Sequence, residues 1–268
     1  MTSASAAVGT VARPASPPPV AAPTLPRVPR VVDRGIAHHD ALRAEVWTAR
    51  GTVKVTGDVE VVTADVGDAL AVGGSVSAAA FSCRGSLEVE GAVRVRDLLR
   101  LRGTVHAAGL VHAGDLRLDG SARVVGAVTV DRSATVRGGL LAASVTAELL
   151  DLDGSATVPG ELRATTVLAE FRRRSAFGKV FGRTVRLRGH VPNLVDKAFF
   201  HLDPATVERI EADSVELTAV SVAFVRAKEI VLGRHAHVTA AEGTIVRRHP
   251  TSSVGPESKS PPPYGLRR

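Results

Sequence analysis

The chain has 268 residues, of which 44% are hydrophobic but only 3% aromatic, so valine, alanine and leucine must fill its core. The net charge is +7, and the only cysteine, Cys83, excludes an internal disulfide framework and is typical of a reducing compartment. The sequence contains no apolar run long enough to cross a membrane and no secretory signal pattern, so we expect a cytoplasmic protein without a transmembrane segment.

Proline dominates the beginning of the chain. Residues 1–30 hold seven of the fifteen prolines, between small and polar side chains. Such a composition buries too little apolar surface to offset the entropy of ordering, so we predict a disordered tail over residues 1–40. The stretch from His38 to Trp47 is a transition for which we predict a short helix or an irregular cap, with Trp47 covering one end of the core.

From Gly51 onward a short repeat returns. The units begin at intervals of about 17 residues, and most of them contain two glycines six residues apart, as in GTVKVTG, GSLEVEG, GSARVVG and GSATVPG. Self-similarity at a short fixed period is typical of solenoids. The units begin at Gly51, Asp68, Gly85, Gly103, Gly120, Gly138 and Gly154.

Within each unit, apolar and other residues alternate. The third residues are all apolar: Val53, Leu70, Leu87, Val105, Ala122, Leu140 and Ala156. The fifth residues are apolar as well: Val55, Val72, Val89, Ala107, Val124, Ala142 and Val158. Alternation with period two predicts strands with one face inward, and the glycines permit corners that a Cβ would penalise. We therefore predict an all-β protein, a single-stranded β-helix with about 17 residues per turn, whose first stack spans residues 41–170.

The pattern changes after residue 170. Residues 171–205 combine phenylalanines with arginines, and we predict a basic insertion or connector there, with a short helix from Leu194 to His201. Regular spacing resumes with Ile210 and Val215, repeated fifteen residues later by Val225 and Ile230. This favours a second β-helix stack over residues 206–248, followed by a disordered Pro-rich tail over 249–268.

Repeats such as LRLRGTVHAAGLVHAGDLRLDGSARVVGAVTV, flanked by Pro-rich tails, resemble the bactofilins, which are polymer-forming cytoskeletal proteins of bacteria. The later stretch VERIEADSVELTAVSVAFVRAKEIVLGRHAHV is similar to the end of a longer, two-part subset of that family. The resemblance covers roughly residues 46–248. It implies a right-handed β-helix that assembles end to end without nucleotide and serves cell shape, envelope organisation or protein localisation.

The strongest chemical signal outside the scaffold is a run of cations. Residues 163–188 carry eight of them against the single acid Glu170. Arginines between phenylalanines can bind anionic lipid, acidic protein or nucleic acid, although a solvated loop would have the same composition. The candidate anionic-partner site consists of Arg163, Arg172, Arg173, Arg174, Lys179, Arg183, Arg186 and Arg188.

Other groups favour structural explanations over catalysis. The pair Asp151 and Asp153 shares one outward face, a geometry suited to acid–base chemistry that is more often a solvated sheet face. The pair His235 and His237 lacks a third metal ligand at a convincing spacing. No phosphate-binding glycine loop and no nucleophile motif occur, so we expect no catalytic residues, no metal and no cofactor.

These patterns predict a non-enzymatic, bactofilin-like scaffold that associates with copies of itself. Its tails are candidates for recruiting cell-envelope or membrane-associated proteins, which would allow a peripheral position at the inner face of the membrane. Nucleic acid is not expected as a partner. The alternative is a monomeric or dimeric adaptor that binds an anionic partner through residues 163–188, and an enzyme built on a β-helix is a third class without supporting residues.

Overall fold

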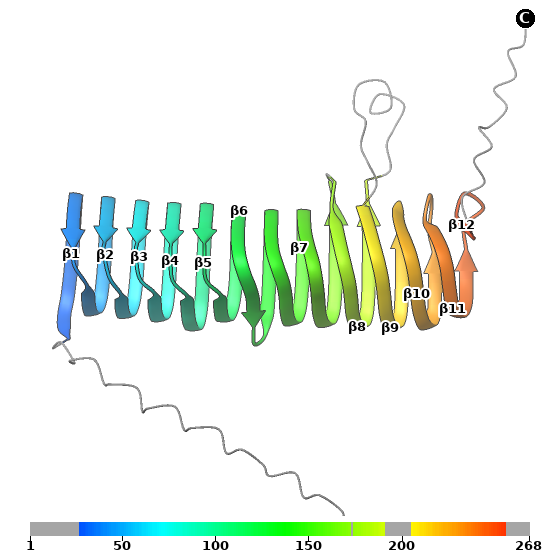
Figure 1. The fold of residues 1–268 in the computed structure, drawn as a ribbon, viewed down its shortest axis with the longest axis horizontal. Coiled ribbons are helices and arrows are strands. Elements are labelled where there is room, and N and C mark those ends of the chain that lie inside the picture. The colour runs from blue at the N-terminus through cyan, green and yellow to red at the C-terminus, as the bar shows by residue number, and fades with distance from the viewer. Residues whose placement is uncertain (1–26, 173, 191–204, 256–268) are drawn as a thin grey trace, which may run out of the picture.

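The computed structural model describes residues 27–172, 174–190 and 205–255, which form one long rod of stacked coils (Figure 1). Every strand pairs in parallel with the next strand in chain order, within a single twelve-stranded sheet. The strands are β1 Val28–His39, β2 Leu42–Val55, β3 Val59–Val72, β4 Val76–Val89, β5 Val93–Ala107, β6 Val111–Val130, β7 Ser133–Phe171, β8 Ala176–Gly189, β9 Ala205–Thr218, β10 Val220–Leu232, β11 His237–Arg248 and β12 Ser253–Val254. The predicted all-β solenoid is confirmed.

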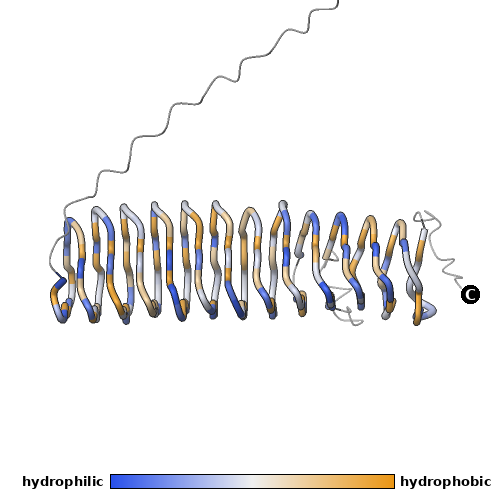
Figure 2. The backbone as a smooth tube through the Cα atoms, turned by 90° about the horizontal axis from the view of Figure 1, so that it is seen from below, coloured by the Kyte–Doolittle hydropathy of each residue, from blue (hydrophilic) through white to orange (hydrophobic). Residues whose placement is uncertain are grey.

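Each coil has three short faces around a narrow core. On every face two residues separated by one outward residue point inward, because successive side chains of a strand alternate between its two sides. In the coil of β3 the inward pairs are Val59 and Val61 on face A, Ala64 and Val66 on face B, and Leu70 and Val72 on face C. Three such pairs recur in every coil from β2 to β7, and Figure 2 shows the resulting alternation of hydropathy along the tube.

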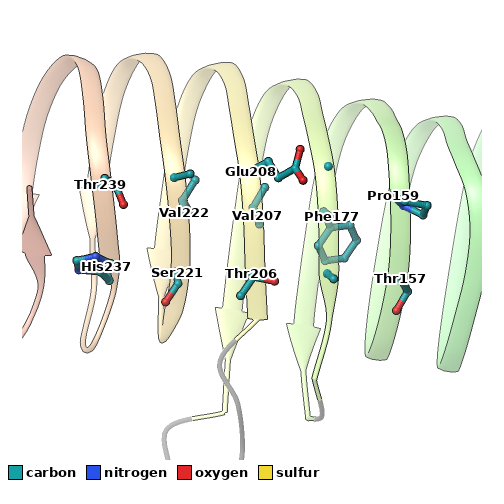
Figure 3. Close-up of a pocket in the computed structure, with 13 residues that line it drawn as sticks. Thr157, Pro159, Phe177, Thr206, Val207, Glu208, Ser221, Val222, His237 and Thr239 are labelled. Atoms are coloured by element: carbon teal, nitrogen blue, oxygen red, sulfur yellow. The ribbon is translucent and has the colours of Figure 1, made fainter. Parts of the chain in front are cut away.

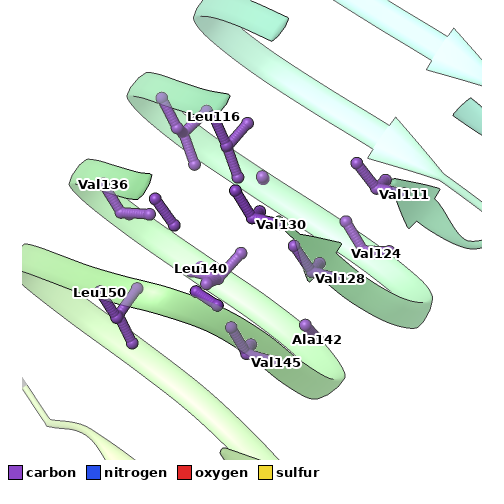
Figure 4. Close-up of a cluster of buried hydrophobic side chains, with 14 of the residues drawn as sticks. Val111, Leu116, Val124, Val128, Val130, Val136, Leu140, Ala142, Val145 and Leu150 are labelled. Atoms are coloured by element: carbon purple, nitrogen blue, oxygen red, sulfur yellow. The ribbon is translucent and has the colours of Figure 1, made fainter. Parts of the chain in front are cut away.

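Small branched side chains fill the core, as the composition predicts. Both predicted apolar columns are buried throughout, and they form the inward pairs of face C. Figure 4 shows how such residues from neighbouring coils, for example Val124 and Ala142, meet between β6 and β7. Each coil covers the apolar surface of the next, so the stability of the rod is close to a sum over neighbouring coils.

The glycine that begins each repeat lies at the corner between faces B and C. Gly51, Gly85, Gly103, Gly120, Gly138 and Gly154 all have positive φ. At Gly120 a Cβ would lie 2.1 Å from the carbonyl oxygen of Gly103 in the preceding coil, so glycine is needed both for its conformation and for space. Asp68, the one exception in the column, has φ 72° and accepts a hydrogen bond from the backbone N–H of Gly51.

The start of the rod differs from the prediction. Residues 28–39 lie inside the predicted disordered tail, yet they form β1 and pair in parallel with β2. Val31 and Ala37 pack against the core, and the ladder to β2 satisfies the backbone on one side of β1. No helix follows: β2 begins at Leu42, and Trp47 is fully buried within it.

The predicted connector also differs. Residues 176–189 form β8, a further coil that pairs with β7 on one side and β9 on the other, so the described coils form one stack. Phe171 and Phe177 do not lie on a loop but are buried side by side, with ring centroids 5.4 Å apart. The predicted helix from Leu194 to His201 lies outside the described residues.

The last coils are shorter than the first. Val225 pairs with Ile210 and Ile230 with Val215, which confirms the repeat of fifteen residues. The stack also reaches past the predicted boundary at residue 248, because β12 pairs with the beginning of β11.

Candidate functional site

The two ends of the rod differ in how they close the core. At the N-terminal end, Asp33 takes an inward position over Ala49, in a column that is apolar from β2 to β10 and ends at Arg248 in β11. Its Oδ2 accepts a hydrogen bond from Nε1 of Trp47 at 2.8 Å and lies 3.1 Å from Nε2 of His39. A satisfied polar group therefore covers the core at this end.

The C-terminal end leaves apolar side chains partly uncovered. Ile245 continues the inward column of Ile230 but is 39% exposed, and Ala241 and Val254 are partly buried neighbours of the core. In the described chain, β12 covers only the first two residues of β11, so most of the outer edge of β11 has no paired strand. Open edges of this kind are templates for pairing with another chain.

The predicted basic segment does not form one patch. Arg163 contacts Glu161 at 2.8 Å and lies over the ring of Phe181, whereas Arg172 bonds Asp153. Because β7 and β8 wind around the rod, the described cations of the segment lie on different faces and corners.

The acids of neighbouring coils neutralise much of this segment. Arg186 and Arg188 meet at Glu216, with N–O distances of 2.7 and 3.1 Å. Lys179 lies in register between Glu161 and Arg209. Arg183 lies close enough to Asp213 for its positive charge to help lower the pKa of that carboxyl. Arg174 precedes β8, and Arg173 lies outside the described residues. The structure thus joins Arg186 with Arg188 at Glu216, and Arg172 lines one hollow with Arg188. Arg163 and Lys179 both neighbour Glu161, away from that group.

A different basic surface was missed by the sequence analysis. On face B of β4 to β7, outward positions in successive coils carry Arg84, Arg100, Arg102, Arg117 and Arg137, which we call the arginine face. Its members are separated by about one coil in the sequence, so they never form a visible run of charge. Reading the arginines at the repeat spacing, instead of along the chain, would have found them.

Arginine–carboxylate pairs join successive coils along the outside of the rod. Arg50 and Arg84 contact Asp65 at 2.9 and 3.2 Å. The hydrogen bond from Arg50, assisted by Arg84, outweighs the effect of burial and holds the pKa of Asp65 below its usual value. The hydrogen bond from Arg132 likewise lowers the pKa of Asp115.

Acid should therefore weaken the fold. A carboxylate whose pKa is lower in the folded chain stabilises the fold above its unfolded pKa of about 3.9, and this contribution is lost as the pH falls through the folded value. We expect the midpoint of thermal unfolding to hold down to about pH 5 and to drop below about pH 4. In the variant Asp65→Asn, the midpoint of thermal unfolding should fall less between about pH 5 and about pH 4 than it does in the parent protein. In the exposed control Asp151→Asn, it should fall as much as in the parent. Equal pH profiles for the two variants in circular dichroism melts would contradict this account.

The single thiol is sealed inside the stack. Cys83 is buried in the inward column of face B, and burial, with a smaller effect of Asp65, raises the pKa of its thiol to about 11. Because the thiolate is the reactive form, we expect the native protein to resist a thiol reagent at pH 8 and the unfolded protein to react at once. Rapid labelling of the native protein, followed by absorbance, would contradict the sealed position.

A shallow groove of about 460 Å³ lies on face C near the C-terminal end (Figure 3). Its walls are small side chains such as Thr157, Thr206 and Ser221, and its ionisable members are Glu208 and His237. Glu208 lies two coils from the level of His237, a separation of about 10 Å, which is too long for an acid–base pair. His237 instead contacts Oγ of Ser253 through Nδ1 at 2.5 Å.

Within the described ranges, no group of three or more potential ligands is arranged to hold a metal ion. The described part of the chain also has no helix suited to crossing a membrane. No family model, curated protein or solved structure matches this chain. The bactofilin resemblance therefore stays a prediction from the sequence.

Proposed function

We propose that the protein is a non-enzymatic structural scaffold whose copies associate through the ends of the coil stack, as the resemblance to bactofilins implies. One observation carries the proposal: Ile245 ends an otherwise buried column with 39% of its surface exposed, beside the open edge of β11. A second copy stacked there would bury this surface and pair the edge. The regular three-faced coils form a rod of constant cross-section, and on the described surface no reactive groups converge.

The proposed cellular role follows from that shape. A rod of stacked coils gives a stiff, repetitive surface on which other proteins can be held at fixed intervals. We place this role in the cytoplasm, in organising cell shape or in localising partners, including partners at the inner face of the membrane. The alternative, an adaptor that uses residues 163–188, is less well supported, because most of those cations already have acidic neighbours.

Sedimentation velocity over a range of concentrations, combined with negative-stain electron microscopy, tests the proposal. We expect species larger than one chain that grow with concentration and appear as threads one rod wide. A single monomeric species at all concentrations would overturn it.

A further inference from the structure

The arginine face is more strongly charged than its own neighbours require. Five arginines stand on it against one acid, Asp119, which gives a net charge of +4 within four coils. At the edge of the face, Asp115 lies close enough to Arg117 for that arginine to help lower the pKa of its carboxyl, but Asp115 is held by Arg132. Nε of Arg102 lies 3.5 Å from Oδ2 of Asp119. Arg84 and Arg50 both form ion pairs with Asp65. In the described chain no ion pair or hydrogen bond holds the guanidinium groups of Arg100, Arg117 and Arg137.

Two of these arginines stand directly against each other. Arg100 and Arg117 are partners in the ladder between β5 and β6, so their Cα atoms are one strand spacing apart, about 4.8 Å. Like charges directly opposite each other in a sheet are destabilising. In addition, Nε of Arg100 is buried without a hydrogen-bond partner among the described residues. Such an arrangement lowers the stability of the free protein, and we expect it at a site where a bound ligand supplies the missing counter-charge and hydrogen bond.

The arginine face has definite limits. It extends over about three coil spacings, or roughly 14 Å, along the rod and about 7 Å across. On one side it ends at Asp65 in β3. On the other side it ends one coil after Arg137, within β7, where Gly154 lies against Gly138 of the preceding coil. That coil carries Asp151 and Asp153. The positive surface is therefore an island between two acidic boundaries on a flat face.

These dimensions select among anionic partners. A lipid bilayer lying on face B would also press against Asp151 and Asp153, which would repel its headgroups. Single-stranded nucleic acid binds by stacking its bases on aromatic side chains, and the arginine face has none. A short extended peptide, at about 3.3 Å per residue, spans the same 14 Å with four or five residues.

We propose that the arginine face binds an acidic segment of a partner protein, about four or five residues long, in an extended conformation along the rod. The carboxylates of the segment meet the guanidinium groups of Arg100 and Arg117 and reduce the repulsion between these two like charges. Binding of such a partner would identify one protein that the scaffold localises. It does not depend on self-association, so the two proposals can fail separately.

Fluorescence anisotropy with a labelled oligoglutamate peptide tests this proposal on the full chain. We expect binding that weakens at high salt, no binding of an oligoglutamine peptide, and affinity at least about tenfold lower for the triple variant Arg100→Gln, Arg102→Gln, Arg117→Gln. The matched control replaces Arg163, Arg186 and Arg188 by glutamine and should bind within about twofold of the parent. Circular dichroism melts verify that both variants are folded.

Three outcomes would overturn the inference: no binding of oligoglutamate, equal losses in the two triple variants, or loss only in the control variant. Vesicles of phosphatidylserine and phosphatidylcholine and a short DNA duplex form the remaining arms of the experiment. If either binds through the arginine face more tightly than oligoglutamate, the partner is a membrane or a nucleic acid and the proposal of an acidic protein segment is wrong.

Discussion

Replacing Gly120 by alanine is expected to destabilise the rod by at least about 2 kcal/mol. Gly120 has φ +139°, which L side chains rarely adopt, and the new Cβ would lie 2.1 Å from the carbonyl oxygen of Gly103. The backbone of two coils would have to move apart. Because coils are stabilised only by their neighbours, this shift would also weaken the ladders on both sides.

Gly139 provides a matched control for this substitution. It is one coil further along and one residue past the corner, its φ is not positive, and the nearest atom to an added Cβ is 3.7 Å away. Gly139→Ala should therefore change the free energy of unfolding by less than about 0.5 kcal/mol. Denaturant unfolding of the two variants measures the contrast, and equal effects would show that the corner does not restrict the residue as the structure implies.

Replacing Ile245 by lysine is expected to weaken self-association by at least about tenfold while leaving the single chain folded. The side chain is 39% exposed in the free protein, so a charged end can reach water there. In a stacked copy the same position would be covered, and the buried ammonium group would lack a partner. The apolar contact of isoleucine would be lost as well.

The neighbouring residue distinguishes end stacking from general surface charge. Val246 is 61% exposed and has no partner in the ladder to β10. Val246→Lys adds the same charge to the same coil and should associate nearly as the parent does. Sedimentation velocity of both variants makes the comparison; an Ile245→Lys protein that assembles like the parent would exclude this end as the contact.

The regular part of the fold could be predicted from the sequence because a solenoid repeats its local rules. Glycine at Gly85 and Gly103 marks corners, and alternating residues such as Val105 and Ala107 mark the inward side. Each repeat therefore confirms the assignment of the previous one. Even the exception at Asp68 keeps its place in the column, since aspartate tolerates positive φ better than most residues.

The ends and the charged surfaces could not be predicted in the same way. No residue of β1 is fully buried, and its order comes from the ladder to β2, which composition does not reveal. The sequence predicts one cluster of arginines in residues 163–188, because it shows proximity along the chain and not around the rod. Winding separates Arg163 from Arg186, while it brings Arg100 and Arg117 into direct register.

X-ray fibre diffraction from oriented assemblies gives the most direct test of the claim that coils continue from one copy into the next. Parallel strands spaced about 4.8 Å apart along the rod should produce a reflection at that spacing parallel to the long axis of the assembly. A reflection at that spacing perpendicular to the long axis would mean that the rods join side by side, and the end-to-end scaffold would be contradicted.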